Sequence, residues 1–143
     1  INTNNLEEVD ARNLSKEATS KIKLDNLSNL IRIDLSHNHY YYQNNLSFLD
    51  FSNFKRLEHL HLRNIYSNLT EILFKISDSI THIDLSNNLI DFKSINVSSL
   101  KNLLEISVEN CSIRDSDLVS SFNSQDIRLI NLKFNKILKI KQN

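Results

Sequence analysis

Apolar residues recur along the chain in a short pattern that is itself repeated at a longer period. Each copy has apolar residues at its first, fourth and sixth positions, and three of the six copies have Asn at the ninth. The copies begin near residues 6, 30, 57, 80, 103 and 127, which gives steps of 24, 27, 23, 23 and 24 residues. Because alternate residues of a strand point to opposite faces, the middle of each copy predicts a short strand with one buried face.

A strand of about three residues is not stable alone, but stacked copies form a parallel sheet with a spacing of about 4.8 Å and a continuous core. We therefore interpret residues 1–143 as a single array of six coils, where a coil is one copy of the motif with the chain that follows it. The run Ile137–Ile140 looks like the start of another coil. We expect the array to be part of a longer one, or its ends to be covered by a partner.

The ninth position of each copy has a structural task in this interpretation. An Asn amide can bond backbone groups of its own coil and of the neighbouring coil where the chain turns without Gly. A thiol can donate weakly from the same place. Ile65 cannot donate, so we expect its coil to be looser or differently turned. The expected turn ladder consists of Asn38, Asn88, Cys111 and Asn135.

The copies resemble the leucine-rich-repeat motif, L-x-x-L-x-L-x-x-[N/C]-x-L, over nearly the whole chain, including the family's exchange of Asn for Cys at Cys111. The step of 23–24 residues is similar to that of extracellular repeats, such as Toll-like receptor ectodomains and the secreted leucine-rich immune proteins of mosquitoes. The resemblance implies an α/β-repeat solenoid with a concave parallel sheet and an irregular or short-helical convex side. It also implies recognition of a protein ligand, most simply in extracellular innate immunity.

The stretches between the motif copies should return the chain along the convex side. Residues 115–122 are compatible with a short helical turn there. The apolar and aromatic residues of these stretches are expected in the core and not on a ligand platform. The residues expected to face inward are Leu46, Leu49, Phe51, Phe54, Leu69, Ile72, Leu73, Ile76, Val97 and Leu100.

Polar residues that alternate with the buried ones should lie on the concave face in three columns, because the copies are in phase. Such a mixed polar surface suits recognition of a protein by hydrogen bonds and paired charges. The first column is Glu8, Arg32, His59, His82, Glu105 and Leu129, the second Asp10, Asp34, His61, Asp84, Ser107 and Asn131, and the third Arg12, Ser36, Arg63, Ser86, Glu109 and Lys133. We expect partner contacts at Arg32, Asp34, His59, His61, Arg63, His82, Asp84 and Glu105.

Three histidines of these columns should be neighbours, namely His59, His61 and His82, with Asp34 and Asp84 beside them. Three imidazoles and a carboxylate could bind zinc. A solvated polar face that happens to be rich in His, or a pH-sensitive contact, explains the same residues. We favour the solvated face and predict no metal.

The 27-residue coil carries its extra residues around His39–Asn44, just after the Asn turn. Tyr is frequent in binding hot spots. Tyr41 is expected to point inward, whereas Tyr40 and Tyr42 are candidates for partner contact. Packing of all three within the enlarged coil is the alternative.

Composition and charge exclude several classes. The chain has no Gly, so a Gly-rich phosphate loop is absent, and no Ser–His–Asp arrangement has independent support. Its 17 basic and 17 acidic residues balance, and no basic stripe suggests nucleic acid. No apolar run reaches the roughly 18 residues of a membrane span. We predict a non-enzymatic protein without cofactor or direct membrane insertion.

Six N-glycosylation sequons favour a secreted protein or the extracellular domain of a membrane protein. Asn13 and Asn110 lie at strand exits, where a glycan would mask binding surface. The candidates for use are therefore Asn26, Asn45, Asn68 and Asn96. A cell-adhesion protein has the same architecture. The single cysteine and the lack of disulfide caps favour instead a cytoplasmic adaptor or a pathogen effector that recruits a target protein.

Overall fold

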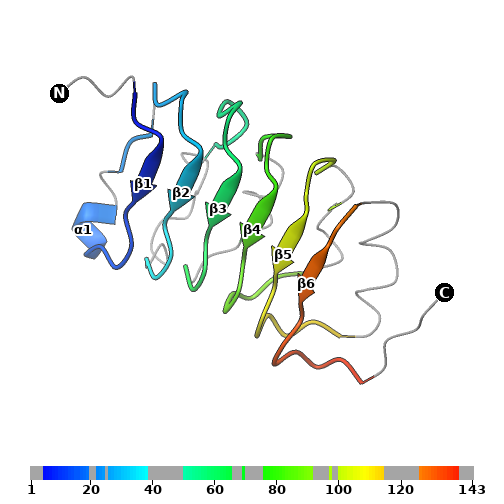
Figure 1. The fold of residues 1–143 in the computed structure, drawn as a ribbon. Coiled ribbons are helices and arrows are strands. Elements are labelled where there is room, and N and C mark those ends of the chain that lie inside the picture. Colours follow the sequence, from blue (N-terminus) through cyan, green and yellow to red (C-terminus); the bar gives the residue numbers. More distant parts are fainter. Residues whose placement is uncertain are drawn as a thin grey trace.

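Six parallel strands form one sheet in the computed structural model, which describes residues 5–19, 22–24, 26–38, 50–65, 69, 76–91, 97, 100–114 and 126–138. The strands follow one another across the sheet in sequence order, so the chain is a parallel β-solenoid (Figure 1). They are β1 (Glu8–Asp10), β2 (Arg32–Asp34), β3 (His59–His61), β4 (His82–Asp84), β5 (Glu105–Ser107) and β6 (Leu129–Asn131).

The register of the sheet is the one that the repeat predicts. Glu8 pairs with Arg32, Arg32 with His59, and the first column continues in this way to Leu129. The second and third residues of every strand pair in the same manner. A slip by one residue would turn the apolar middle residue of a strand to the solvent, and burial of this residue therefore fixes the register.

The core runs behind the sheet and is densest in coils 2 to 5. The middle strand residues Ile33, Leu60, Ile83 and Ile106 are buried, whereas Val9 and Ile130 are only partly buried. The convex side adds core residues whose inward orientation the sequence predicts. Those among the described residues are Phe51, Phe54, Leu69, Ile76, Val97 and Leu100.

Two of these, Phe51 and Phe54, come from the long second coil, and their ring centroids lie 6.2 Å apart. Phe51 also bridges to Ile76 of the next coil. Neighbouring coils are thus joined on the convex side as well as through the sheet.

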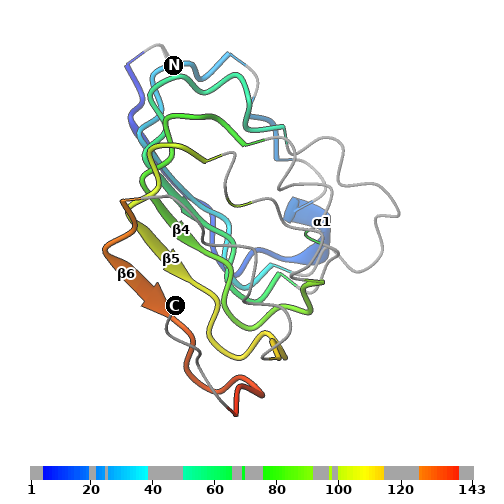
Figure 2. The same ribbon diagram turned by 90° about the vertical axis from the view of Figure 1, so that its right-hand side faces the viewer.

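Helices contribute little to the described residues. The one helix there is α1 (Lys16–Thr19), a single turn in coil 1, and Figure 2 shows it on the side of the molecule away from the sheet. The sequence predicts an irregular or short-helical convex side. In the described parts of coils 2 to 6 it is irregular, with turns and isolated bridges, and the short-helical alternative is not seen there. Residues 115–122, where a helical turn is predicted, lie outside the described residues. No helix within the described ranges is long and apolar enough to cross a membrane.

The ninth position of the repeat joins neighbouring coils by hydrogen bonds. Asn88 Nδ2 donates to the carbonyl of Leu62 in the preceding coil and to that of Leu85 in its own coil, both at 2.8 Å. Its Oδ1 accepts the Ile65 N–H at 3.0 Å. Asn38 and Asn135 make the same kinds of bond.

Cys111 takes part in this ladder through its thiol, which donates to the carbonyls of Leu85 and Glu109 at 3.4 Å. Burial raises the pKa of the Cys111 thiol and outweighs its backbone hydrogen bonds. The residue is therefore a structural thiol held in its neutral form.

Of the two expectations for the coil of Ile65, a looser coil or a different turn, the different turn is wrong. Ile65 is fully buried, and the preceding Asn64 has the same backbone conformation as its equivalents in the other coils. The reason lies in the neighbours. The carbonyls that an Asn at this position would bond already accept from Asn38 and Asn88. No carbonyl of the turn is therefore left unpaired by an apolar side chain.

A second column, which the sequence analysis did not identify, lies one residue before the ladder. Every coil has a residue with a φ angle between 53° and 61° there. Left-handed backbone costs most residues about 1–2 kcal/mol, and Asn is one of the few besides Gly that adopt it readily. In a chain without Gly, Asn fills most of these positions. The column is Asn13, His37, Asn64, Asn87, Asn110 and Phe134.

Candidate recognition surface

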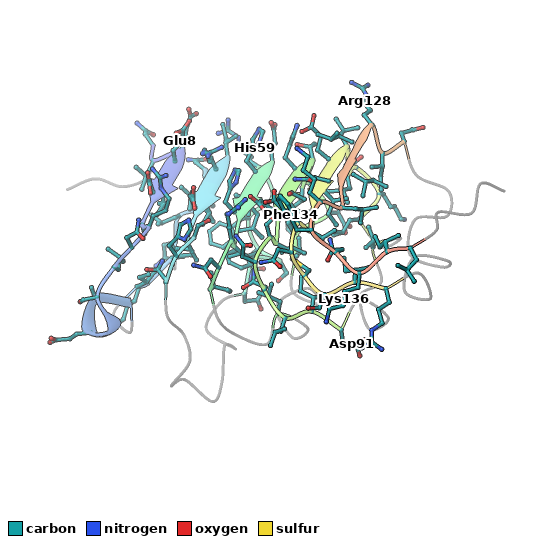
Figure 3. All side chains as sticks on the ribbon, turned by 90° about the horizontal axis from the view of Figure 1, so that it is seen from below. Glu8, His59, Asp91, Arg128, Phe134 and Lys136 are labelled. Atoms are coloured by element: carbon teal, nitrogen blue, oxygen red, sulfur yellow. The ribbon has the colours of Figure 1, made fainter. Side chains whose placement is uncertain are left out.

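The concave face of the sheet carries the polar side chains that alternate with the buried ones. Figure 3 shows Glu8 and His59 among the side chains that stand on this side of the sheet. Seven of the eight residues expected to contact a partner lie in β2 to β5, and the eighth, Arg63, lies two residues after β3. The structure thus brings them together on one continuous surface.

The histidines of the first column are stacked. The ring centroids of His59 and His82 lie 4.3 Å apart, with 20° between the ring planes. The His82 Nδ1 lies 2.8 Å from Thr81 Oγ1, and its Nε2 lies 3.7 Å from a carboxylate oxygen of Glu105. Burial lowers the pKa of His59, and the neighbouring His82 lowers it further. His59 is therefore predominantly neutral at neutral pH.

His61 pairs in register with Asp34 on one side and Asp84 on the other. Its Nε2 is buried and has no hydrogen-bond partner among the described residues. Burial lowers the pKa of His61, Arg32 adds to this effect, and the two carboxylates oppose it. His61 is thus held neutral in spite of its acidic neighbours.

A metal site at the histidines finds no support in the geometry. Within the described ranges, no group of three or more His, Cys, Asp or Glu side chains is arranged so that it could hold a metal ion. The stacked rings of His59 and His82 pack face to face and do not converge on a common point.

Charged residues at the β1–β2 end of the face are paired with each other. The Arg12 guanidinium donates to both carboxylate oxygens of Asp10 and lies 3.7 Å from Asp34. Arg32 lies 3.9 Å from the same Asp34 oxygen. The bond from Arg12 holds the pKa of Asp10 below its ordinary value, although burial opposes it. These charges therefore partly neutralise one another.

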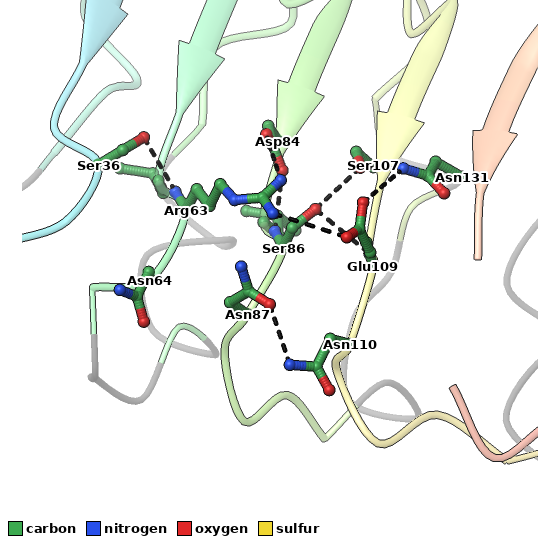
Figure 4. A network of polar contacts seen from close by, with 12 residues as sticks. Ser36, Arg63, Asn64, Asp84, Ser86, Asn87, Ser107, Glu109, Asn110 and Asn131 are labelled. Carbon is green, nitrogen blue, oxygen red and sulfur yellow. Dashed lines mark hydrogen bonds and ion pairs between the residues drawn. The ribbon is translucent and has the colours of Figure 1, made fainter. Parts of the chain in front are cut away.

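A network of side chains ties the last four strands together near their C-terminal ends (Figure 4). Arg63 approaches Asp84 at 4.0 Å and Glu109 at 3.6 Å. Asn131 donates to Glu109 at 3.2 Å and to the Ser107 hydroxyl at 3.0 Å. The hydroxyls of Ser107 and Ser86 are 2.8 Å apart. Because each group has several partners, the network holds its side chains in place.

Some predicted site residues lie outside the described residues, namely the loop candidates Tyr40 and Tyr42 and the sequons Asn45, Asn68 and Asn96. Asn26, the remaining glycosylation candidate, is described and exposed, in a turn with a φ angle of 67°.

A groove of about 510 Å³, which the sequence does not predict, lies at the rim where the strands begin. It crosses several coils because residues from each copy converge there, and the repeat pattern carries no signal for it. Charged and apolar residues line it, among them Ile31, Arg56, Thr81, Lys101, Leu104 and Asp126.

Comparison with known proteins adds no family to this picture. A scan against protein-family models finds no match, and a search of the curated proteins finds none either.

Proposed function

We propose that this chain is a leucine-rich-repeat protein that acts as a non-catalytic recognition module and binds a protein partner on its concave face. The motif supports the family, because a strand with apolar residues at fixed positions recurs in every copy, and the ladder position is Asn in three copies and Cys in a fourth. The convex side of such a protein would be irregular or short-helical.

The observation that carries this proposal is the fixed polar surface on β2 to β5. Its charged groups are only partly exposed and are held by neighbours on adjacent strands, as the Arg63 network shows. A surface whose side chains are already ordered loses less conformational entropy on binding. A surface with both positive and negative groups favours binding of a partner with complementary charges over nonspecific association.

An extracellular role in innate-immune recognition is the version that we favour, since the repeat length and the sequons agree with it. The partner is a protein, and further repeats or a second partner would cover the partly exposed end coils. The proposal involves no cofactor, nucleic acid or membrane insertion.

A cytoplasmic adaptor or effector is the second candidate, and one observation favours it. Cys111 is a free thiol, as is usual in a reducing compartment. Mass spectrometry of the natural protein separates the two candidates. Glycans on Asn26 establish the extracellular version, and complete absence of glycans favours the cytoplasmic one.

Affinity capture with the intact chain tests the binding face. The double variant Arg32→Glu/Arg63→Glu reverses two charges on the concave face, whereas Lys23→Glu makes the same change at an exposed position outside the strands. Thermal melting checks that both fold. We expect the control to retain the partner and the double variant to lose it. Equal capture by both folded variants contradicts the proposal.

A further inference from the structure

One residue departs from the pattern of the left-handed column. At this position Asn occurs in four coils and His in one, but the last coil has Phe134, with a φ angle of 57°. A bulky aromatic side chain is unfavourable in left-handed backbone, and the chain offers Asn at the equivalent place in coils 3, 4 and 5. Local backbone preference therefore does not explain Phe134.

Burial does not explain Phe134 either, because its side chain is 78% exposed. The usual compensation for a strained residue is packing in the core, and here it is missing. A residue that has an unfavourable backbone conformation and also exposes a large apolar side chain is expected at a functional site. Phe134 projects at the turn that follows β6, the rim where the strands end (Figure 3).

A second large apolar side chain lies on the same rim. Leu89 follows the ladder residue of coil 4 directly and is 81% exposed. Coils 4 and 6 are two steps, about 10 Å, apart in the sheet. Because Leu89 follows its ladder residue and Phe134 precedes its own, this spacing is the smallest separation of the two residues. Ser112 of the intervening coil is exposed and small, so it leaves the space between them open.

The charges next to Phe134 are unlike those of the concave face. Lys133 and Lys136 are both exposed, and neither side chain has a hydrogen-bond or ion-pair partner within the described residues. The carboxylate in the described part of coil 6, Asp126, lies on the opposite rim, where it lines the groove at the strand starts. The other described carboxylates near this rim belong to the neighbouring coils, namely Glu109 of coil 5, which Arg63 and Asn131 hold, and the exposed Asp91 of coil 4. The positive charge beside the exposed ring of Phe134 is therefore that of Lys133 and Lys136 in coil 6.

We propose that the strand-end rim of coils 4 to 6 binds an acidic segment of a protein partner, with Phe134 and Leu89 as its apolar contacts. Lys133 and Lys136 pair with the carboxylates of this segment. The inference deepens the proposed function and rests on it in one respect, that the natural ligand is a protein. A helix with apolar residues seven positions apart has the required spacing, since seven residues rise about 10.5 Å.

A designed peptide serves as the probe, namely a labelled 15-residue acidic helix with two leucines seven positions apart. Two control peptides carry Ser in place of Leu, or Lys in place of the acidic residues. Fluorescence anisotropy with the full chain is expected to show binding of the first peptide alone. Raising NaCl from about 50 to 500 mM should weaken binding several-fold, because exposed charges are screened. Equal binding of the basic peptide overturns the proposal.

The variant Phe134→Asn gives the sharper readout. We expect it to weaken peptide binding at least about tenfold and to raise the melting temperature by about 4 °C, because Asn suits the left-handed backbone. The matched control Leu6→Ser removes an exposed apolar side chain from coil 1 and should leave binding unchanged. A lower melting temperature for Phe134→Asn identifies a structural role and overturns the inference, as does unchanged binding.

Affinity capture separates failure of this inference from failure of the proposed function. If the concave double variant loses the partner while Phe134→Asn retains both partner and peptide binding, the proposed function stands and the rim site is wrong. If the intact chain captures no partner, the proposed function fails, and the peptide assay alone decides whether the rim binds acidic segments.

Discussion

Replacement of Asn88 by Ala tests the hydrogen-bond ladder at its most connected position. Asn88 is 4% exposed and bonds backbone groups of two coils. Its removal leaves the Leu62 carbonyl and the Ile65 N–H without a partner, in residues that are fully buried. A buried group left unpaired costs about 1–3 kcal/mol, so the two groups together should lower the free energy of unfolding of Asn88→Ala by about 2–6 kcal/mol.

Cys111→Ala is the matched control, because it changes the same position on the next coil. The carbonyls that accept from the thiol keep other donors. Leu85 retains the Asn88 amide and Glu109 retains the Asn87 N–H. No carbonyl is left unpaired. The loss is that of one buried sulfur and of its weak contacts with the backbone N–H groups of Asn87 and Asn88, about 1 kcal/mol.

Urea unfolding of both variants measures the difference through the midpoint, provided that the denaturant slope is unchanged. We expect Asn88→Ala to be the more destabilising by a clear margin. Equal costs for the two variants would refute the reasoning, since they would show that loss of side-chain volume, and not backbone pairing, sets the energy of the ladder.

Three further predictions concern the core, the histidines and the thiol. Phe51→Ala should lower the free energy of unfolding by about 3–5 kcal/mol, because Phe51 is fully buried between coils; a loss below 1 kcal/mol in urea unfolding would contradict this. Burial lowers the pKa of His61 in the folded chain below its ordinary value of 6.5. As the pH falls from 6.5 toward this lowered pKa, the unfolded chain binds a proton that the folded chain does not, and the free energy of unfolding decreases. His61→Gln should reduce the loss of stability between pH 7.5 and 5.5, and an unchanged loss argues against a neutral His61. Cys111 should resist a thiol reagent in the native protein and react after denaturation, because it is buried and burial raises its pKa; rapid native labelling, followed by absorbance, would disprove this.

The sequence predicted the sheet in detail because the apolar positions repeat in phase. Ile33, Leu60 and Ile83 occupy equivalent places in successive copies, and a shift of register would expose all of them. The inward orientation of Phe51 and Phe54 followed from the same requirement for a continuous core.

The turn at Ile65 was mispredicted because hydrogen bonds were assigned to one residue at a time. Backbone carbonyls are shared between coils, so Asn38 and Asn88 supply what Ile65 lacks. The left-handed column was missed although its signal is visible. Asn64, Asn87 and Asn110 recur at 23-residue steps, directly before the ladder position.

The pairing of charges on the concave face could not be predicted from the sequence, for a different reason. The columns place Arg63 near both Asp84 and Glu109, but rotamers decide which contacts form. The same holds for the stacked rings of His59 and His82, which the pattern places as neighbours without fixing their orientation.

Each strand pairs only with the strands before and after it. The free energy of unfolding is therefore approximately a sum of contributions from single coils and from the interfaces between neighbouring coils. Opening should start at coils 1 and 6, whose middle residues Val9 and Ile130 are only partly buried, and amide hydrogen exchange should be slowest in β3 and β4. A ligand bound at Phe134 would stabilise coil 6, one of the two coils that open first. Recognition at this rim would then lengthen the native lifetime of the whole array, and binding and resistance to proteolysis would rise together.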